Sequence, residues 1–280
     1  MISIDVGRMS GLSWLMLRTF CLCWVLAGSF VLGQSAELPE KDSFHLFLLV
    51  GQSNMAGRGT LDELAAIPHP RVMMLTKDRT WDLATDPLHF DKPGIVGVGL
   101  GREFAEAVAE ANPKIVVGLI PCAVGGSPIS SWQPGEYYPP TKSHPWDDAI
   151  ARAQAALKKG TLKGILWHQG ESDSNAELAL AYEAALKDLI ERFRSTLSAQ
   201  EVPFVAGQMG IFAERPWSEA KQEVDRVHRE LPKSVAKTGF ASAEGLKHKG
   251  DEIHFDTASF RELGRRYYAV WSELAAGSEK

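Results

Sequence analysis

Three residues of this chain have the types that nucleophilic catalysis needs. Ser53 lies in the segment Gly-Gln-Ser-Asn-Met, and Asp251 and His254 begin and end the segment Asp-Glu-Ile-His. A serine hydroxyl attacks an ester when a base removes its proton, and a histidine oriented by a carboxylate is a common base. Each residue alone is more typical of a turn, a helix cap or a solvated side chain, so the residue types leave both interpretations open.

An acyl transfer also needs hydrogen-bond donors for the oxyanion that forms on the ester carbonyl. The backbone N–H of Ser53 is one candidate, and the Gly125–Gly126 turn offers a second because no side chain covers its backbone. The side-chain amide of Gln169 is a third candidate. The alternatives are a tight turn for the glycine pair and an ordinary turn amide for Gln169.

The sequence predicts no metal site. His168 and Glu171 are close in the chain, but no His-Glu-x-x-His or Cys/His spacing accompanies them. A structural histidine is therefore the favoured interpretation of His168. The other histidines are scattered along the chain.

Short apolar runs alternate with longer amphipathic segments, which predicts a three-layer α/β sandwich with a mostly parallel sheet. The apolar runs are continuous, as in strands that are covered on both faces. The predicted strands are Phe44–Val50, Val72–Leu75, Ile115–Ile120, Gly164–Trp167, Pro203–Gln208 and Ser234–Thr238. The predicted helices are Leu100–Ala111, Asp147–Lys158, Ala176–Leu197, Ser218–Leu231 and Thr257–Leu274.

Polar or glycine-rich segments follow several of the predicted strands. Gly51–Met55 follows the first, Ala123–Ser127 the third and His168–Asp173 the fourth, and Asp251–His254 lies near the C-terminus. Ligands of such sheets bind at the carboxyl ends of the strands, so these segments are expected to meet at one edge. Met55 stands where the Gly-x-Ser-x-Gly elbow has its second glycine, which argues against an α/β-hydrolase.

The composition is that of an ordinary globular protein. Of the 280 residues, 45% are hydrophobic and 23% are charged, and the net charge is −5. A chain with this charge has no basic field to bind nucleic acid or an anionic membrane surface. Both partner classes are therefore disfavoured.

Residues 1–33 are predicted to be a secretory signal peptide, with residues 34–280 as a single domain. Arg8 and Arg18 precede the apolar run Phe20–Leu32, and small residues that follow permit cleavage after Gly33 or Ala36. The alternative is an uncleaved membrane anchor. Export to the periplasm or the extracellular space is expected, with no membrane attachment after cleavage. The mature chain would keep Cys122 as its single cysteine, so no internal disulfide is expected.

The chain resembles SGNH-type hydrolases of the sialate O-acetylesterase and carbohydrate esterase family 6 group, which includes acetylxylan esterases. The resemblance rests on Leu49–Gly57, Gly125–Trp132, Trp167–Asp173 and Asp251–His254, which follow the order and spacing of that group. It implies a flavodoxin-like central sheet. It also implies an enzyme that removes acetyl groups from sugars, without a cofactor and without an obligate protein partner.

The resemblance assigns roles to individual residues. Ser53 matches the nucleophile, His254 the base and Asp251 its orienting acid. Ser53 and Gly126 match backbone donors of the oxyanion hole, with Gly125 as the alternative to Gly126. Gln169 stands where many SGNH enzymes have an asparagine donor. Glu171 is expected to organise the same loop from behind the site.

Sugar binding is expected of the aromatic residues in the Pro-rich stretch after the glycine turn. Trp132 is the candidate side chain, followed by Tyr137, Tyr138 and Trp146, and the alternative is a plain surface loop. Two other functions are also compatible with the fold. One is a lipase-like or thioester-cleaving SGNH hydrolase, and the other is a catalytically silent carbohydrate-binding relative, which an intact Ser53, Asp251 and His254 disfavour.

Overall fold

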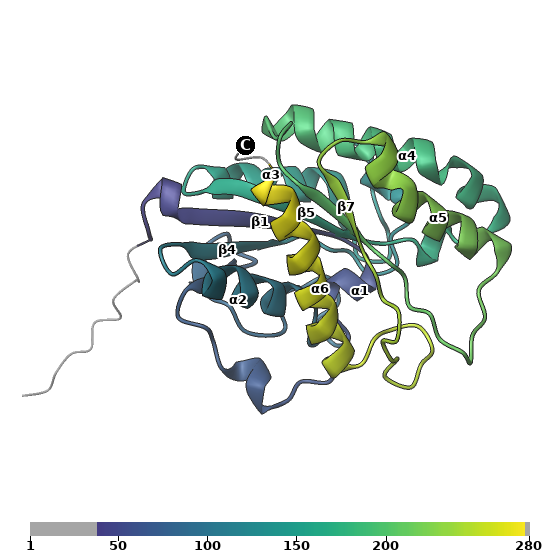
Figure 1. Ribbon diagram of the computed structural model, residues 1–280, viewed down its shortest axis with the longest axis horizontal. Coiled ribbons are helices and arrows are strands. Elements are labelled where there is room, and N and C mark those ends of the chain that lie inside the picture. Colours follow the sequence, from purple (N-terminus) through teal and green to yellow (C-terminus); the bar gives the residue numbers. More distant parts are fainter. Residues whose placement is uncertain (1–37, 278–280) are drawn as a thin grey trace, which may run out of the picture. The chain divides into compact units, whose positions relative to one another are not determined.

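A seven-stranded sheet organises residues 38–277, the part of the chain that the computed structural model describes (Figure 1). The strands are β1 (Phe44–Gly51), β2 (Val72–Leu75), β3 (Trp81–Leu83), β4 (Val116–Pro121), β5 (Thr161–His168), β6 (Phe204–Gly207) and β7 (Thr238–Ala241). Their order in the sheet is β3-β2-β4-β1-β5-β6-β7, and only β2 and β3 pair antiparallel. The predicted signal peptide lies outside the described residues.

Helices cover both faces of the sheet, which confirms the predicted three-layer α/β fold (Figure 1). The α-helices are α1 (Ser53–Ala56), α2 (Gly101–Ala111), α3 (Pro145–Leu157), α4 (Ala176–Leu197), α5 (Glu219–Ser234) and α6 (Thr257–Ala276). The short 3-10 helices are Lys41–Ser43, Glu63–Ala66, Ile129–Trp132 and Glu171–Asp173. Residues of α3, α4 and α5 belong to one core cluster, and residues of α2 and α6 belong to the other.

The central strand β1 shows why its sequence is apolar throughout. Leu48 and Val50 point into the core under α3, α4 and α5, whereas Phe47 and Leu49 point into the core under α2 and α6. Successive side chains of a strand point to opposite faces, so a strand that is covered on both faces needs apolar residues at every position. The strand therefore has no solvent-facing side at these positions.

Side-chain caps fix where the helices next to the site begin. The Asn175 side chain accepts hydrogen bonds from the first free N–H groups of α4, at 3.2 and 3.0 Å. Asp256 accepts one from Ser259 N–H of α6 at 2.7 Å. These caps satisfy backbone donors that have no partner within the helix. The cap of α6 lies two residues after His254, so it also fixes the end of the histidine loop.

The structure differs from the predicted elements at two places. The final strand is β7 rather than Ser234–Thr238, because α5 continues past Pro232 to Ser234. The edge strand β3 was not predicted, since it is only Trp81–Leu83 and two of its residues are exposed. A short, half-exposed segment has no apolar pattern that would mark it as a strand.

The strand order places the site at a topological switch point. From β1 the chain first builds the β2 and β4 side of the sheet and then crosses to β5. Ligands of α/β sheets bind where the order reverses in this way. β4 lies between β2 and β1, which differs from the flavodoxin-like order, where the first strand is next to the second. The carboxyl ends of β4, β1 and β5 are consequently neighbours.

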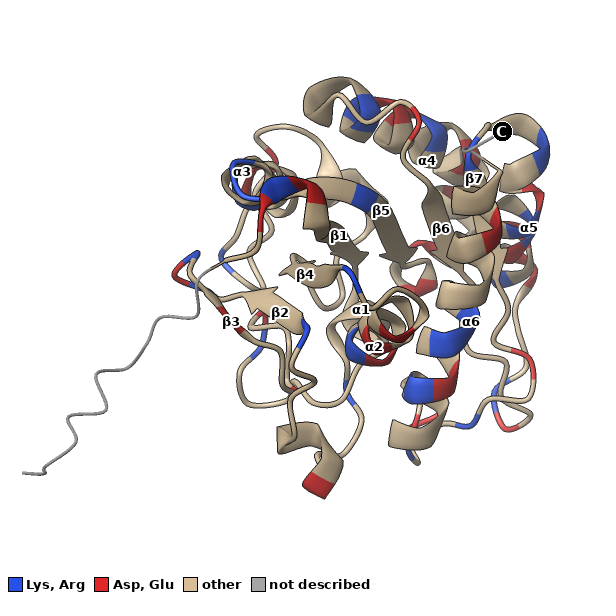
Figure 2. Cartoon of the chain, turned by 60° about the vertical axis from the view of Figure 1, so that its left-hand side comes forward, with Lys and Arg blue, Asp and Glu red and all other residues tan. Residues whose placement is uncertain are grey.

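Charged residues lie on the outer layers, with both signs interleaved along α4, α5 and α6, while the central strands are nearly free of charge (Figure 2). Arg226 illustrates this mixing, because it pairs with Glu183, Glu223 and Glu230 at 3.0, 2.6 and 2.9 Å. Between residues 38 and 277, no helix combines the length and apolar character needed to cross a membrane.

Candidate active site

Ser53 stands at a sharp turn between β1 and α1. Gly51 has φ of +127°, and a Cβ at this position would overlap the backbone of His168 at the end of β5. Gln52 N–H donates to His168 O at 2.9 Å. Only glycine fits the positive φ and this close approach. The turn is therefore anchored on β5, and Ser53 remains 8% exposed at its tip.

The structure brings Ser53, His254 and Asp251 together as the sequence predicts. His254 Nε2 lies 3.0 Å from Ser53 Oγ, although the two residues are 201 positions apart in the chain. His254 Nδ1 lies 2.7 Å from Asp251 Oδ2. Both pairs of atoms are within hydrogen-bond distance. With the ring proton on Nδ1, His254 donates to Asp251 and accepts from Ser53, as a base between a nucleophile and an orienting acid requires.

A bend in the loop before α6, rather than a turn of helix, holds Asp251 beside His254. Asp251 Oδ1 accepts the backbone N–H of Ile253 at 3.0 Å and of His254 at 2.8 Å. Aspartate side chains commonly stabilise such turns by accepting N–H groups two residues on. The other carboxylate oxygen remains available for the imidazole.

The carboxylate of Asp251 stays ionised in the site. Partial burial acts to raise the pKa of Asp251, but the hydrogen bonds from the His254 backbone and ring and from Ile253 N–H outweigh it and lower the pKa to about 2. A carboxylate that accepts several hydrogen bonds is stabilised in its charged form. Asp251 can therefore stabilise a positive charge that forms on His254.

Two backbone donors of the expected oxyanion hole are unoccupied. Within residues 38–277, neither Ser53 N–H nor Gly126 N–H makes a hydrogen bond. Gly125 N–H, the alternative donor, is already donated to Asp91 Oδ2 at 2.7 Å. The geometry thus favours Gly126 over Gly125.

Several side chains hold the Gly125–Gly126 turn in place. Gly126 O accepts hydrogen bonds from Tyr138 Oη at 2.7 Å and from Ser172 Oγ at 2.9 Å. Asp91, which binds Gly125, forms a buried ion pair with Arg58 at 2.8 Å. Sequence analysis missed Asp91 and Arg58, because 33 residues separate them and no local pattern marks either one.

The structure does not support Gln169 as an oxyanion donor. Gln169 is fully buried, and its Nε2 donates to Ser127 O at 3.1 Å and to Asp173 Oδ2. Its Oε1 accepts from Tyr182 Oη at 2.8 Å. An amide NH2 group has two hydrogens, and both are used inside the protein. Gln169 instead joins the loop after β5 to the loop after the glycine turn.

Gln169→Ala is expected to lower stability more than the catalytic rate. The substitution removes one hydrogen-bond partner from each of three buried groups, on Ser127, Asp173 and Tyr182, which should lower the free energy of unfolding by about 2–4 kcal/mol. The kcat of the folded enzyme should fall less than about tenfold, because no transition-state contact is removed. Urea denaturation and kcat, measured on the same preparation, test this. A variant of wild-type stability with kcat lowered about 10²- to 10³-fold would restore the oxyanion role.

Trp132 is a core residue and does not bind sugar. It is fully buried, its Nε1 donates to Ser127 Oγ at 3.0 Å, and its ring packs edge-on against Trp167 at 5.3 Å. The prediction was wrong because the 3-10 helix turns this ring inward. Trp146 is also buried, whereas Tyr137 is 49% exposed.

Glu171 lies behind the nucleophile and contacts it through Asn54. Its Oε1 accepts from Asn54 Nδ2 at 2.7 Å, while its Oε2 is buried without a partner among the described residues. His168 does not join it in a ligand set, since its Nδ1 lies 3.0 Å from Tyr267 Oη. Burial lowers the pKa of His168 to about 4, so the ring is neutral. In the part of the chain that the structure covers, no cluster of His, Cys, Asp or Glu could hold a metal ion.

Asn54 is a site residue that sequence analysis missed. Its Nδ2 also donates to Ile253 O at 3.1 Å, and its Oδ1 accepts from Phe255 N–H at 3.4 Å. Ile253 and Phe255 are the two neighbours of His254. Asn54 directly follows Ser53, and its side chain therefore holds the backbone on both sides of His254 close to the nucleophile. Its place after Ser53 was visible in the sequence, but its partners about 200 positions away were not.

Asn54→Ala is expected to lower kcat by about 10- to 100-fold and to change KM little, because the base loses its fixed position relative to the nucleophile. Steady-state kinetics with a soluble acetyl ester measures both constants. Asn175→Ala serves as the matched control, since it removes an exposed helix cap that contacts none of Ser53, His254 and Asp251, and it should cost about 1 kcal/mol of stability without affecting kcat. Wild-type kcat in Asn54→Ala would contradict the positioning role.

Comparison with known families agrees with this geometry. Residues 43–272 match the sequence model of a family described as carbohydrate esterase, sialic acid-specific acetylesterase. The chain belongs to this family. It is accordingly a carbohydrate esterase, one of the carboxylic ester hydrolases. The sialate O-acetylesterase part of the expected resemblance is confirmed, and the comparisons do not address carbohydrate esterase family 6.

Relatives in this carbohydrate esterase family cover most of the chain. A probable carbohydrate esterase of Arabidopsis thaliana is 30% identical over 239 residues, which are 78% of this chain and 86% of the relative. An Arabidopsis thaliana protein structure superposes with a TM-score of 0.72 at 28% identity, covering 84% of this chain and 99% of that one. Human sialate O-acetylesterase is 27% identical over 54% of this chain, and the match spans 35% of the human protein.

A further structure supports the fold alone. A carbohydrate acetylesterase from Xanthomonas citri has a TM-score of 0.63 at 19% identity, over 83% of this chain and 57% of that one. The mostly parallel α/β architecture is therefore shared with solved carbohydrate esterases.

Proposed function

We propose that the protein is a serine esterase that removes O-acetyl groups from carbohydrates through an acetyl-enzyme intermediate. The observation that carries this proposal is the continuous hydrogen-bonded set from Ser53 Oγ through His254 to Asp251, at 3.0 and 2.7 Å. Membership in the carbohydrate esterase family supports an acetylated carbohydrate as the substrate.

The first half-reaction acylates the enzyme. Ser53 Oγ attacks the ester carbonyl carbon while His254 Nε2 takes the hydroxyl proton. The N–H groups of Ser53 and Gly126 donate to the oxyanion of the tetrahedral intermediate, and the charge of Asp251 stabilises the imidazolium. The C–O bond to the sugar then breaks, and His254 returns the proton to the leaving sugar hydroxyl.

The second half-reaction releases acetate. His254 Nε2 takes a proton from water, and the resulting hydroxide attacks the acetyl carbonyl. The same backbone donors stabilise the second oxyanion. When the intermediate collapses, the proton returns to Ser53 Oγ, so the enzyme is restored and no cofactor is consumed.

A chain-length series of 4-nitrophenyl esters tests the acyl preference. We expect kcat/KM to be highest for acetate and to fall at least about tenfold for octanoate, because a pocket that fits a methyl group rejects longer acyl chains. A preference for long chains would indicate a lipase-like or thioesterase-like enzyme. A folded protein without activity on any ester would indicate a silent carbohydrate-binding relative.

The sugar is identified by a second measurement. Acetate release from acetylated xylan, acetylated pectin and O-acetyl sialic acid is compared at equal acetyl concentration. We propose acetylxylan or an O-acetylated sialic acid as the substrate class. Release from none of these carbohydrates, with 4-nitrophenyl acetate still hydrolysed, would contradict it.

Export belongs to the same proposal. Residues 1–33 have the charge, apolar run and small residues of a secretory signal, so we propose a periplasmic or extracellular enzyme. N-terminal sequencing of the protein from its native host should find Gln34 or Glu37 as the first residue. A chain that retains Met1 in the membrane fraction would instead show an uncleaved anchor.

A further inference from the structure

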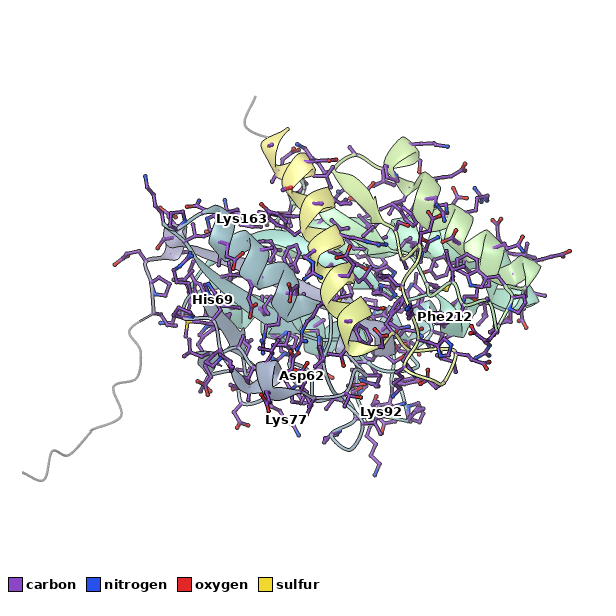
Figure 3. All side chains as sticks on the ribbon, turned by 60° about the horizontal axis from the view of Figure 1, so that its bottom comes forward. Asp62, His69, Lys77, Lys92, Lys163 and Phe212 are labelled. Carbon is purple, nitrogen blue, oxygen red and sulfur yellow. The ribbon has the colours of Figure 1, made fainter. Side chains whose placement is uncertain are left out.

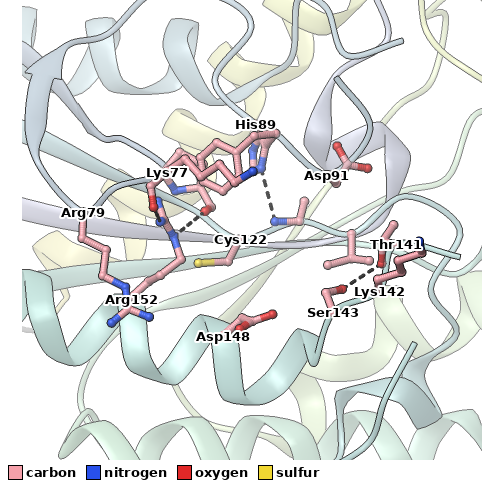
Figure 4. A pocket seen from close by; sticks show the side chains of 14 residues that line it. Lys77, Arg79, His89, Asp91, Cys122, Thr141, Lys142, Ser143, Asp148 and Arg152 are labelled. Atoms are coloured by element: carbon pink, nitrogen blue, oxygen red, sulfur yellow. Dashed lines mark hydrogen bonds between the residues drawn. The ribbon is translucent and has the colours of Figure 1, made fainter. Parts of the chain in front are cut away.

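A cavity of about 330 Å³ lies at the carboxyl ends of β2 and β4 (Figure 4). The segment after β2, residues 89–91, residues 121–124, residues 141–143 and α3 form its walls. None of its wall residues belongs to the Ser53, His254 and Asp251 set. The cavity is therefore separate from the ester-cleaving groups.

Positive charge predominates on the cavity walls. Four cationic side chains line it, and the two carboxylates are Asp91, which is paired with Arg58, and Asp148. The cationic residues are Lys77, Arg79, Lys142 and Arg152. Across residues 38–277, none of these four forms an ion pair, although the chain as a whole has a net charge of −5. The cavity wall is therefore positively charged in a protein whose net charge is negative.

Arg152 adds a buried positive charge to the cavity. Its side chain donates to backbone carbonyls, including Pro121 O at 3.0 Å and Leu75 O at 2.6 Å, and to no carboxylate of the described residues. Only 6% of the residue is exposed. A buried charge without a counter-charge is costly, and an anion in the cavity would offset that cost.

His89 supplies an unpartnered donor on the same wall. Its Nδ1 accepts Ala123 N–H at 3.2 Å, as the dashed line in Figure 4 shows. Burial lowers the pKa of His89 to about 3, so the ring is neutral and carries its proton on Nε2. His89 is 4% exposed, and its Nε2 is buried without a partner among the described residues. A buried donor of this kind usually has an acceptor.

The cavity adjoins the oxyanion side of the ester site. Asp91 lines the cavity and accepts Gly125 N–H. The next residue, Lys92, has its Nζ 3.8 Å from where a Cβ on Gly126 would lie. Lys77 and Lys92 lie along the same edge of the view in Figure 3. The loop that carries Lys142 also carries Tyr138, whose hydroxyl binds Gly126 O. A substrate held at Ser53 can thus extend over Gly126 toward the cavity.

We propose that this cavity is a subsite for an oxyanionic substituent, a carboxylate, sulfate or phosphate, on the acetylated carbohydrate whose ester reaches Ser53. The proposal rests on the proposed function. It names a class of substrate, the acidic acetylated sugars. The cationic side chains and the free His89 N–H provide the charge and the donor that such a group requires.

The test compares a monoacetylated methyl glucuronoside with the methyl glucoside acetylated at the same position. The variant is Lys77→Gln/Lys142→Asn, with asparagine chosen because Lys142 has φ of +52°, which asparagine tolerates. The matched control, Lys158→Gln/Lys159→Gln, removes the same charge from exposed positions at the end of α3. Both sugars are assayed at low and high ionic strength.

We expect the wild-type enzyme to prefer the glucuronoside at low salt, mainly through a lower KM. The cavity variant should lose about five- to tenfold in kcat/KM on the glucuronoside and less than about twofold on the glucoside. The control should retain the preference, and salt should reduce it. Equal hydrolysis of both sugars by the wild type, or an equal loss on both in the cavity variant, would overturn the subsite and leave the proposed function standing. If neither sugar ester is cleaved, the subsite is overturned, whereas the proposed function is still decided by acetate release from acetylated xylan, acetylated pectin and O-acetyl sialic acid.

Discussion

Ser53→Ala is expected to lower kcat by about 10⁴- to 10⁶-fold while the protein remains folded. The substitution removes the atom that attacks the ester, and it deletes only one oxygen from a side chain that packs at the tip of the turn after β1. Among residues 38–277 its one side-chain partner is His254 Nε2, which water can replace. Kinetics with 4-nitrophenyl acetate and acetate release from an acetylated sugar measure the loss.

Ser195→Ala is the matched control for this variant. Ser195 is an exposed serine of α4 whose hydroxyl donates to Arg192 O at 3.2 Å, so its loss should leave kcat unchanged. Circular dichroism melting curves of both variants show whether the fold is retained. If folded Ser53→Ala keeps kcat within tenfold of the wild type, Ser53 is not the nucleophile.

His254→Ala is expected to be about as damaging as Ser53→Ala, because nucleophile and base act as a unit. Asp251→Asn should be milder or equal, with kcat lowered by about 10⁴-fold. Its amide oxygen can still accept the backbone N–H groups of Ile253 and His254, but its NH2 group would face His254 Nδ1. That contact favours the tautomer with the proton on Nε2, which cannot accept the proton of Ser53.

The double variant Ser53→Ala/His254→Ala separates a shared role from two independent ones. If the residues act together, its rate should match that of either single variant, whereas independent contributions would multiply. A rate for Asp251→Asn clearly below that of His254→Ala would show that the roles of acid and base are assigned wrongly.

The sequence by itself determined the fold class and the three residues at the centre of the site. β1 was predictable because a strand that is buried on both faces is apolar at every position, and helix α4 was predictable because its cap and amphipathic period are local. The segments after β1, β4 and β5 were expected to meet because parallel strands present their carboxyl ends at one edge. Secondary structure and side-chain type depend on neighbours in the chain, so the sequence contains them.

The tertiary structure decided which hydrogen bonds remain free for chemistry. Gln169 was a candidate oxyanion donor by its residue type, but Ser127 and Asp173 accept both hydrogens of its amide, and Asp91 accepts the N–H of Gly125. Trp132 was expected at the surface and lies in the core.

The same distinction explains the residues that were missed. Asn54 forms its contacts with Ile253 and Phe255, and the turn at Gly125 depends on Arg58 through Asp91. A polar group can serve a substrate only if no protein group has already taken its hydrogen bond. Such partners come from distant parts of the chain, so residue types and spacing identify the candidates, and only the folded arrangement shows which of them remain available.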